Sequence, residues 1–175
     1  GSNGKTTTTL LTYHLLKQGG LNVGLAGNIG KSFAWQVAED KVDVYVLELS
    51  SFQLDGIVNY KPHIAVITNI SPDHLDRYNY DYGLYIESKF RVTLNQNEED
   101  FLIYDDDDEA ISIWLKNNKI KAQKLPFSLT HKVEQGSYLE NKTLYNITNN
   151  KQINMPTSNL SLDGMHNVKN AMAET

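Results

Sequence analysis

A chain of 175 residues fits one domain with a full hydrophobic core, and nothing in its length requires a second domain. The formal net charge is −5, from 16 basic and 21 acidic residues, and no sustained lysine or arginine block is present, so we expect no nucleic-acid partner. The absence of cysteine excludes disulfides, thiolate zinc sites and cysteine nucleophiles, and suits a reducing compartment. No apolar run approaches the roughly 20 residues that span a bilayer, so we expect no membrane partner either.

The first part of the chain alternates helical patterns with short apolar strands. The first helix is predicted over residues 5–18, where leucines recur at helical spacing before Gly19 and Gly20 end it. Strands are predicted at residues 23–26, 44–49, 64–68 and 101–104, and further helices at residues 32–39, 82–94 and 106–116. Several strands are apolar at every position, which is typical of strands covered on both faces. The pattern predicts an α/β fold of three layers, a mostly parallel sheet with helices on both faces.

After Leu125 the pattern changes to short segments separated by Asn-Lys and Asn-Asn-Lys turns. These segments cover residues 137–139, 143–147, 152–155 and 160–162. They predict a small antiparallel β-sheet. The chain then passes through Gly164 into a last predicted helix over residues 168–174.

The strongest functional signal is the glycine-rich segment that opens the chain. Gly1-Ser2-Asn3-Gly4-Lys5-Thr6-Thr7 leads directly into a predicted helix and matches the Gly-Lys-Ser/Thr end of a P-loop, whose first glycine we expect upstream of residue 1. In such a loop, glycines let backbone N–H groups surround phosphate oxygens, Lys5 supplies a mobile cation, and the Thr6 hydroxyl binds magnesium. The alternative is a glycine-rich turn that only caps a helix, but the Lys-Thr pair favours the P-loop.

Glu48 is the candidate acid for the magnesium ion of a nucleotide. It follows the buried-strand pattern of residues 44–47, and P-loop proteins place such a carboxylate at the end of a neighbouring strand. An unpaired carboxylate against an apolar sheet is costly, and a bound metal would offset that cost. The alternative is an acid at the strand end that faces water.

Four further segments, together with the loop, resemble motifs of the Mur ligase family. Residues 69–78 are similar to the family's Asn-x-x-x-Asp-His-Leu-Asp stretch, and residues 164–170 to its closing Gly-x-His-Asn-x-x-Asn. Leu-Glu-Leu-Ser-Ser-Phe-Gln-Leu at residues 47–54, with Gly-Asn-Ile-Gly at residues 27–30, resembles the branch of the family that adds D-glutamate. The matches occur in family order over nearly the whole chain.

The resemblance implies that residues 1–175 are the central, ATP-binding domain of a cytoplasmic ligase of peptidoglycan-precursor synthesis. A UDP-binding N-terminal domain and an amino-acid-binding C-terminal domain would be absent, and the domain would be inactive alone. The implied reaction joins D-glutamate to UDP-N-acetylmuramoyl-L-alanine through an acyl phosphate made from ATP, in an enzyme that we expect to be a monomer.

The resemblance also assigns roles to single residues. Lys5, Glu48, His74 and Lys89 would be catalytic, and Thr6, Glu48, His74 and Lys89 would hold two Mg²⁺ ions. Asn28, Ser50 and His74 would contact the substrate. The expected ATP-binding residues are Gly1, Ser2, Asn3, Gly4, Lys5, Thr6, Thr7, Asn167 and Asn170, of which the two last would lie at the adenine.

Lys89 stands where the family typically has a carbamylated lysine. An ammonium beside magnesium is repelled, whereas reaction with carbon dioxide would convert the side chain into a carboxylate-like ligand. Without the resemblance, a solvated lysine on a helix would be the simpler interpretation.

Other polar residues are interpreted as structural. Asp105 to Asp108 could suggest a metal cluster, but consecutive acids between a strand and a helix are more typical of a solvated cap. His14, His63 and His131 have no motif context, and we expect them to be structural or exposed.

Three alternative functions remain: a sibling Mur ligase, a folylpolyglutamate synthetase, and a P-loop ATPase without ligase activity. The Ser-Ser-Phe-Gln segment at residues 50–53 argues against the first two. The order of His74, Lys89 and Asn167 along the chain argues against the third.

Overall fold

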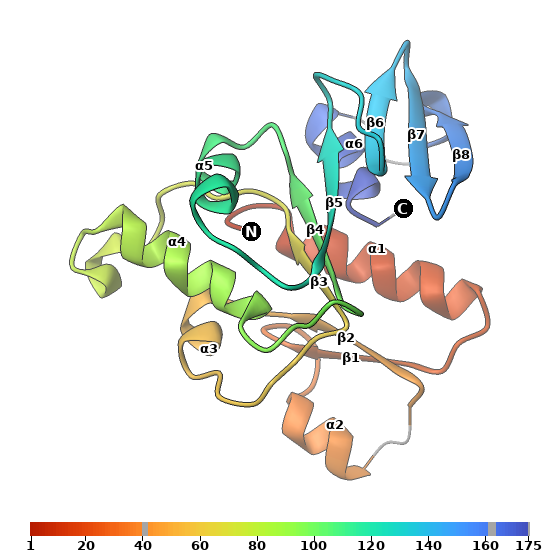
Figure 1. Cartoon of the computed structure of the whole chain (residues 1–175). Coiled ribbons are helices and arrows are strands. Elements are labelled where there is room, and N and C mark those ends of the chain that lie inside the picture. The colour runs from red at the N-terminus through yellow and green to blue at the C-terminus, as the bar shows by residue number, and fades with distance from the viewer. Residues whose placement is uncertain (40–41, 161–163, 175) are drawn as a thin grey trace.

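The computed structural model describes residues 1–39, 42–160 and 164–174. Its strands form two sheets (Figure 1). β1 (Val23–Gly27) and β2 (Val44–Glu48) make a parallel pair. The larger sheet has the order β3–β4–β5–β6–β7–β8, in which β3 to β6 run parallel and the last two pairings are antiparallel. Its strands are β3 (Ile64–Ile67), β4 (Phe101–Asp105), β5 (Gln123–Ser128), β6 (Gly136–Glu140), β7 (Thr143–Thr148) and β8 (Lys151–Pro156).

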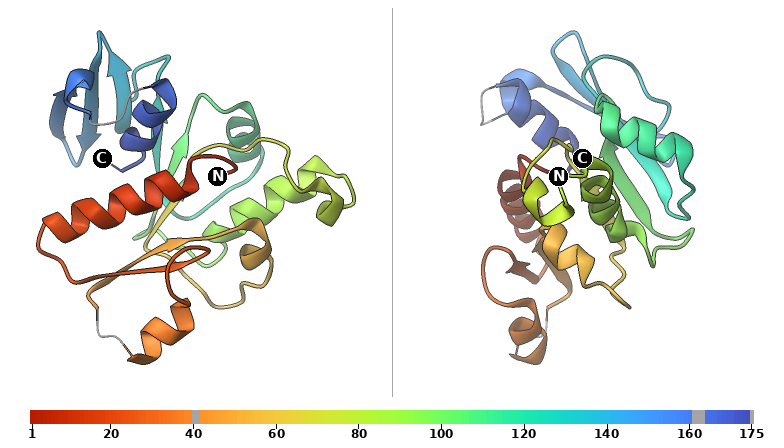
Figure 2. Two further views of the ribbon diagram at one scale, coloured as in Figure 1. Left: turned by 180° about the vertical axis from the view of Figure 1, so that it is seen from behind. Right: turned by 90° about the vertical axis from the view of Figure 1, so that its left-hand side faces the viewer.

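The helices cover both faces of this framework. They are α1 (Lys5–Gln18), α2 (Phe33–Glu39), α3 (Ser51–Asp55), α4 (Tyr82–Phe90), α5 (Glu109–Asn117) and α6 (Met165–Met172), with 3-10 turns at Leu75–Tyr78, Arg91–Thr93 and Thr157–Asn159. α1 packs against β1, β2 and α6, and α6 also packs on β5. In Figure 1, α4 and α5 lie to the left of the large sheet, whereas α6 lies beside β5, between it and the antiparallel strands, and the reversed view in Figure 2 agrees.

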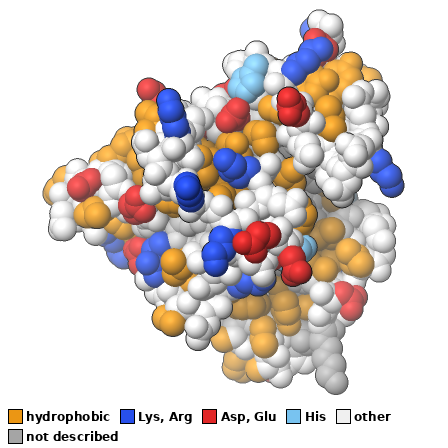
Figure 3. Space-filling model, viewed as in Figure 1, with side chains coloured by type: hydrophobic (Ala, Val, Ile, Leu, Met, Phe, Trp, Pro, Cys, Tyr) orange, Lys and Arg blue, Asp and Glu red, His pale blue; other side chains and the backbone are white. Residues whose placement is uncertain are grey.

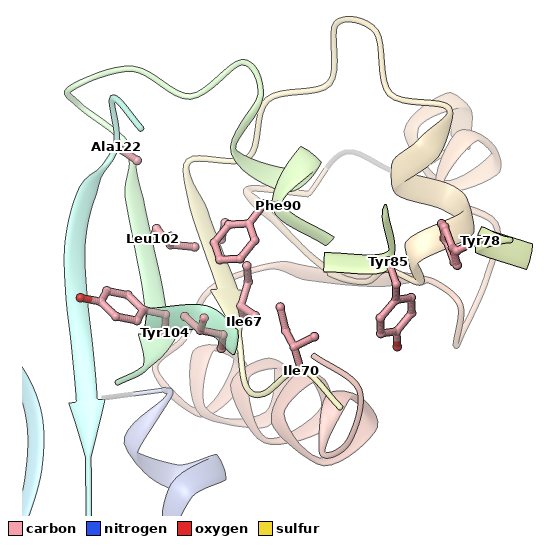
Figure 4. Packing of buried hydrophobic residues seen from close by; sticks show 10 residues of the cluster. Ile67, Ile70, Tyr78, Tyr85, Phe90, Leu102, Tyr104 and Ala122 are labelled. Carbon is pink, nitrogen blue, oxygen red and sulfur yellow. The ribbon is translucent and has the colours of Figure 1, made fainter. Parts of the chain in front are cut away.

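Alternate residues of the parallel strands supply two separate cores. On the side of α4 and α5, Ile67 and Leu102 pack with Phe90 in one buried cluster, as Figure 4 shows. On the side of α6, Val66 and Ile103 pack against a second buried cluster, which contains Phe127, Leu144, Val168, Ala171, Met172 and Ala173. The two-residue period of a β-strand produces this division, since successive side chains point to opposite faces.

The structure confirms the predicted fold class, a mostly parallel sheet between helices with an antiparallel part. It differs in how the strands are joined, because β1 and β2 form their own sheet and the antiparallel strands continue the large one. The joining strand β5 was not predicted, since it carries polar residues at its start and Pro126 within it, which argue against a strand. Of the predicted strand at residues 160–162, Leu160 lies outside any strand, and the rest falls outside the described residues.

Helix boundaries also differ from the prediction. The helix predicted over residues 82–94 ends at Phe90 and continues as a 3-10 turn. The helix predicted from residue 106 begins at Glu109, because Asp108 caps it by accepting a hydrogen bond from the Ile111 N–H at 3.1 Å.

A cavity of about 720 Å³ separates the two sheets. Within the described chain, β2 and β3 face this cavity but are not paired with each other, and Val46 and Val66 are among its apolar lining residues. Gly1 also lines it, and the Ser2 N–H donates to the Asn69 carbonyl at 2.8 Å, just beyond the end of β3. The cavity therefore lies where one more parallel strand, leading into Gly1, would join both sheets.

Over the described ranges, no helix combines the length and the apolar character that a bilayer crossing needs. On the face drawn in Figure 3, lysine and arginine side chains are interspersed with aspartate and glutamate. That face is therefore neither uniformly basic nor uniformly acidic.

We expect an extension of about five β-branched apolar residues ahead of Gly1 to stabilise this chain by at least about 2 kcal/mol. Filling the cavity with a strand buries several side chains worth about 1.5–3 kcal/mol each, which exceeds the cost of ordering about five residues once the two strand edges are also paired. Urea denaturation measures the change. A Gly-Ser extension of equal length is the control, and equal stability of the two extended chains would contradict the expectation.

Candidate phosphate-binding site

The glycine-rich loop is held against the segment that follows β3. The Asn3 N–H donates to Asn69 Oδ1 at 2.8 Å, and Thr68 Oγ1 donates to the Asn3 carbonyl at 2.8 Å. Ser2 Oγ donates to the Ser71 carbonyl at 2.9 Å and accepts from the Ser71 N–H at 2.9 Å. Residues 68–71 therefore fix the loop, although the sequence analysis assigned them no role. Residues 69–71 lie in the Asn-x-x-x-Asp-His-Leu-Asp motif, which could have pointed to them, whereas Thr68 ends the predicted strand before it.

Gly4 is the turning point between this loop and α1. Its φ is +78°, in the left-handed region, and a Cβ at this position would lie 2.4 Å from Asn170 Oδ1. As the N-cap of α1, Gly4 places no side chain in front of the first N–H groups of the helix. These groups and the helix dipole favour an anion at this end. Lys5 Nζ lies over the loop and donates to the Ser2 carbonyl at 2.7 Å, so the geometry fits a phosphate group.

Glu48 ends β2 with only 3% of its surface exposed. Thr6 Oγ1 donates to Glu48 Oε2 at 2.8 Å, and Asn28 Nδ2 donates to Glu48 Oε1 at 3.0 Å. Both partners are neutral, so the charge of the buried carboxylate is not balanced by these contacts. Hydroxyl and carboxylate oxygens are the hard ligands that Mg²⁺ prefers. Thr6 and Glu48 therefore fit a divalent cation beside the loop.

The backbone at Gly27 and Asn28 lies close to that of Glu48. The Asn28 N–H donates to the Glu48 carbonyl at 2.8 Å. Gly27 has φ +102°, and a Cβ there would lie 2.2 Å from the same carbonyl oxygen. Glycine is thus required at this close approach, which holds Asn28 beside Glu48.

Lys89 reaches the same cavity from α4. Its side chain is buried, its Nζ donates to the Gly1 carbonyl at 3.4 Å, and Nζ lies 4.4 Å from the centre of the Tyr85 ring. Burial lowers the pKa of Lys89 to about 8, against the opposing effect of Asp73. Lys5, Glu48 and Lys89 all line the cavity between the sheets, so three of the four residues predicted to be catalytic come together.

His74 stands apart from these three. Its side chain is 60% exposed, its Nε2 lies 3.6 Å from Asp73 Oδ2, and it is not among the residues described as lining the cavity. Its φ of 49° lies in the left-handed region, which is uncommon for a residue other than glycine. Among the described residues, no group of three or more His, Cys, Asp or Glu side chains is arranged to hold a metal ion.

Three further predicted residues, Ser50, Asn167 and Asn170, have clear structural contacts. Ser50 caps α3 in a capping box with Gln53, so its side chain already has a local partner. Asn170 is buried, accepts from Thr8 Oγ1 at 3.5 Å and donates to Asn167 Oδ1 at 3.5 Å. Asn170 thus joins α6 to α1, and Asn167 supports its side chain from within α6.

The interpretation of residues 105–108 as a solvated cap is correct for Asp108 and wrong for Asp105 and Asp107. Asp105 is 2% exposed, and Lys169 Nζ lies 2.6 Å from its Oδ2. Asp107 accepts hydrogen bonds at 2.6 Å from both Ser128 and Thr130. These partners lie far along the chain, so the local pattern could not reveal them.

The histidines without a motif have local partners or face solvent. His14 is exposed, and His63 Nδ1 lies 3.1 Å from Asp100 Oδ1. His131 Nε2 lies 2.8 Å from Asp106 Oδ2. These positions agree with the structural or exposed roles that we expected.

The α/β fold, the glycine loop at the start of α1 and the strand-end carboxylate bonded to Thr6 are together those of a P-loop nucleotide-binding domain. The family model described as the Mur ligase middle domain matches residues 1–175, and the chain belongs to this family. A curated relative, the UDP-N-acetylmuramoylalanine--D-glutamate ligase of Christiangramia forsetii, is 60% identical over 173 residues. That match covers 99% of this chain and 39% of the relative, so the chain spans about two fifths of the relative's length.

Solved structures share the fold at much lower identity. The UDP-N-acetylmuramate:L-alanyl-gamma-D-glutamyl-meso-diaminopimelate ligase of Neisseria meningitides has a TM-score of 0.71 and 20% identity, over 99% of this chain and 57% of that one. The MurF ligase of Thermotoga maritima, solved in complex with ADP, has a TM-score of 0.68 and 19% identity, over 99% and 42%. At these identities the likeness concerns the fold alone.

Lys89→Met is expected to stabilise the chain at pH 7 by up to about 3 kcal/mol, an upper limit because methionine also loses the contacts of the amine with the Gly1 carbonyl and the Tyr85 ring. The pKa of Lys89 is lowered from 10.5 to about 8, so folding disfavours the protonated amine. The penalty is complete below the folded pKa and fades as the pH rises toward the unfolded value. Urea denaturation should therefore show a large gain at pH 7 and a small one near pH 10. A less stable variant at pH 7 would contradict this.

Proposed function

We propose that this chain is the central, ATP-binding domain of a cytoplasmic, monomeric ligase that adds D-glutamate to UDP-N-acetylmuramoyl-L-alanine in peptidoglycan-precursor synthesis. The observation that carries the proposal is the 60% identity, over 99% of the chain, to a ligase of that name. The domain would lie between a UDP-binding N-terminal domain and an amino-acid-binding C-terminal domain, and would be inactive without them.

The site chemistry supports this proposal. Joining a carboxylate to an amine in water is uphill, so the substrate carboxylate must first become an acyl phosphate that the D-glutamate amine can attack. Bringing that carboxylate to a triphosphate sets anion against anion. The loop N–H groups and Lys5 are proposed to lower this repulsion, and hydrogen bonds to residues 68–71 that hold the loop support this role.

Two magnesium ions, when bound, would neutralise charge on the phosphates and on the transferred group. Thr6 and Glu48 are the residues proposed to hold the first, because their oxygens already meet at 2.8 Å. His74 and a carbamylated Lys89 are proposed to hold the second. The lowered pKa of Lys89 supports this role, since only the neutral amine reacts with carbon dioxide.

Other residues would bind and orient the two substrates. Asn167 and Asn170 are proposed to contact the adenine, at the point where α6 meets the loop. Asn28 is proposed to contact the sugar nucleotide, beside Glu48. Ser50 is proposed to lie at the alanyl end of the substrate, and its capping role in α3 fixes its position.

In the full-length protein, Lys5→Ala should reduce ATP-dependent phosphate release by about 10²–10³-fold, because a fixed donor to the transferred phosphate is lost. Lys17→Ala, which changes an exposed lysine of the same helix, should leave the rate unchanged. Release is measured with UDP-N-acetylmuramoyl-L-alanine and D-glutamate, and with the substrate pairs of sibling ligases and folylpolyglutamate synthetase. Preference for another pair, or release without any substrate pair, would replace the proposed function with one of the alternatives.

Carbamylation of Lys89 is tested by ¹³C NMR of the full-length protein in ¹³C-labelled bicarbonate. A carbamate signal should be present near pH 8, where about half of an amine with a pKa of about 8 is neutral. It should weaken as the pH falls, and it should be absent from Lys89→Arg. A spectrum identical to that of Lys89→Arg over this pH range would rule the modification out.

A further inference from the structure

Lys169 and Asp105 form an ion pair that none of the proposed roles uses. Lys169 belongs to α6, and its Nζ lies 2.6 Å from Asp105 Oδ2 and 3.5 Å from Asp107 Oδ2. The Asp105 side chain is almost completely buried, whereas that of Lys169 is partly exposed. The pair therefore joins a helix to a carboxylate inside the domain.

The strand pattern explains why Asp105 faces α6. It is the last residue of β4 and lies two positions after Ile103, whose side chain packs in the core on the α6 side. Its partner in the parallel register is Phe127, which belongs to the same core. Burial raises the pKa of Asp105, and Lys169 acts in the opposite direction. Removing Lys169 would leave this carboxylate without its nearest cation.

Asp107 is a second carboxylate near Lys169, and its position is fixed by hydrogen bonds. Ser128 and Thr130 hydroxyls each donate to its Oδ1 at 2.6 Å, and the Leu129 N–H donates to its Oδ2 at 2.7 Å. Burial works against ionisation, but these hydrogen bonds outweigh it and lower the pKa of Asp107 to about 2. Asp105 is thus held at the end of β4, and Asp107 is bonded to the end of β5. Lys169 therefore interacts with two carboxylates whose positions are fixed by the sheet.

This attachment limits how α6 can rotate. Successive residues of an α-helix point about 100° apart, so Lys169 and Asn170 face different neighbours. Lys169 faces the carboxylates at the sheet edge, while Asn170 meets Thr8 of α1 and the space above Gly4. Because these two adjacent residues are bound to separate elements, α6 can neither rotate about its axis nor slide along it without breaking one of the contacts.

We propose that the Lys169–Asp105 ion pair positions α6 so that Asn167 and Asn170 face the phosphate loop, and that it thereby sets affinity for the base of the nucleotide. The identity of that ligand as ATP rests on the proposed function. The phosphate loop keeps its own hydrogen bonds to residues 68–71, so the pair acts mainly on the base end of the site, even though Asn170 lies beside Gly4.

The test uses the full-length protein and two ligands, ATP and inorganic tripolyphosphate, whose dissociation constants are measured by calorimetry. Lys169→Met should weaken ATP binding about ten- to a hundredfold, because a small misplacement of α6 costs affinity at the base. Binding of tripolyphosphate should stay within about twofold, since its contacts are separate. The KM for ATP should rise with little change in kcat. Lys169→Arg should restore most of the affinity, and Lys116→Met, at an exposed lysine on α5, is the matched control.

The double variant Asp105→Asn with Lys169→Met distinguishes a loss of affinity from a failure to fold. It leaves no unpaired charge at the Asp105 position, and thermal melts should show that it folds even where the single variant does not. It should show the same loss for ATP alone. Equal weakening of both ligands, or no weakening of either, would overturn the proposal. Failure of the unaltered protein to bind ATP would instead overturn the proposed function.

Discussion

Buried negative charge organises one rim of this domain. Glu48 ends β2 inside the protein, and no carboxylate is stable there without donors directed at it. Its two carboxylate oxygens accept hydrogen bonds from Thr6 of α1 and from Asn28 in the turn after β1. The acid therefore connects three segments of the chain. Because these partners are neutral, the negative charge of Glu48 can still attract a cation. The glycine-rich loop beside it can attract an anion.

The same principle operates a second time at the ends of β4 and β5. There the buried Asp105 has a cationic partner, Lys169, and the ion pair attaches α6 to the end of β4. Glu48 and Asp105 occupy equivalent places, each at the carboxyl end of a parallel strand, where α/β proteins form their sites. What distinguishes them is the partner: neutral donors leave a carboxylate available to a ligand, whereas a lysine at 2.6 Å does not.

Features carried by a short stretch of sequence could be predicted, and features made by distant pairing could not. The loop and helix at residues 1–18 and the strand ending in Glu48 have local signals, which the structure places as expected. β5 was missed because Pro126 weakens its local pattern, although its ladder with β4 fixes it. Asp105 was misjudged because its partner lies 64 positions away. The roles of His74, Asn28 and Asn167 depend on ligands and remain predictions.

The cavity between β2 and β3 has a consequence for self-association. An unpaired strand edge is a template for any extended segment, and here two parallel edges face each other across an apolar space. An intramolecular strand fills such a space independently of concentration, whereas a segment from a neighbouring molecule fills it only as the concentration rises.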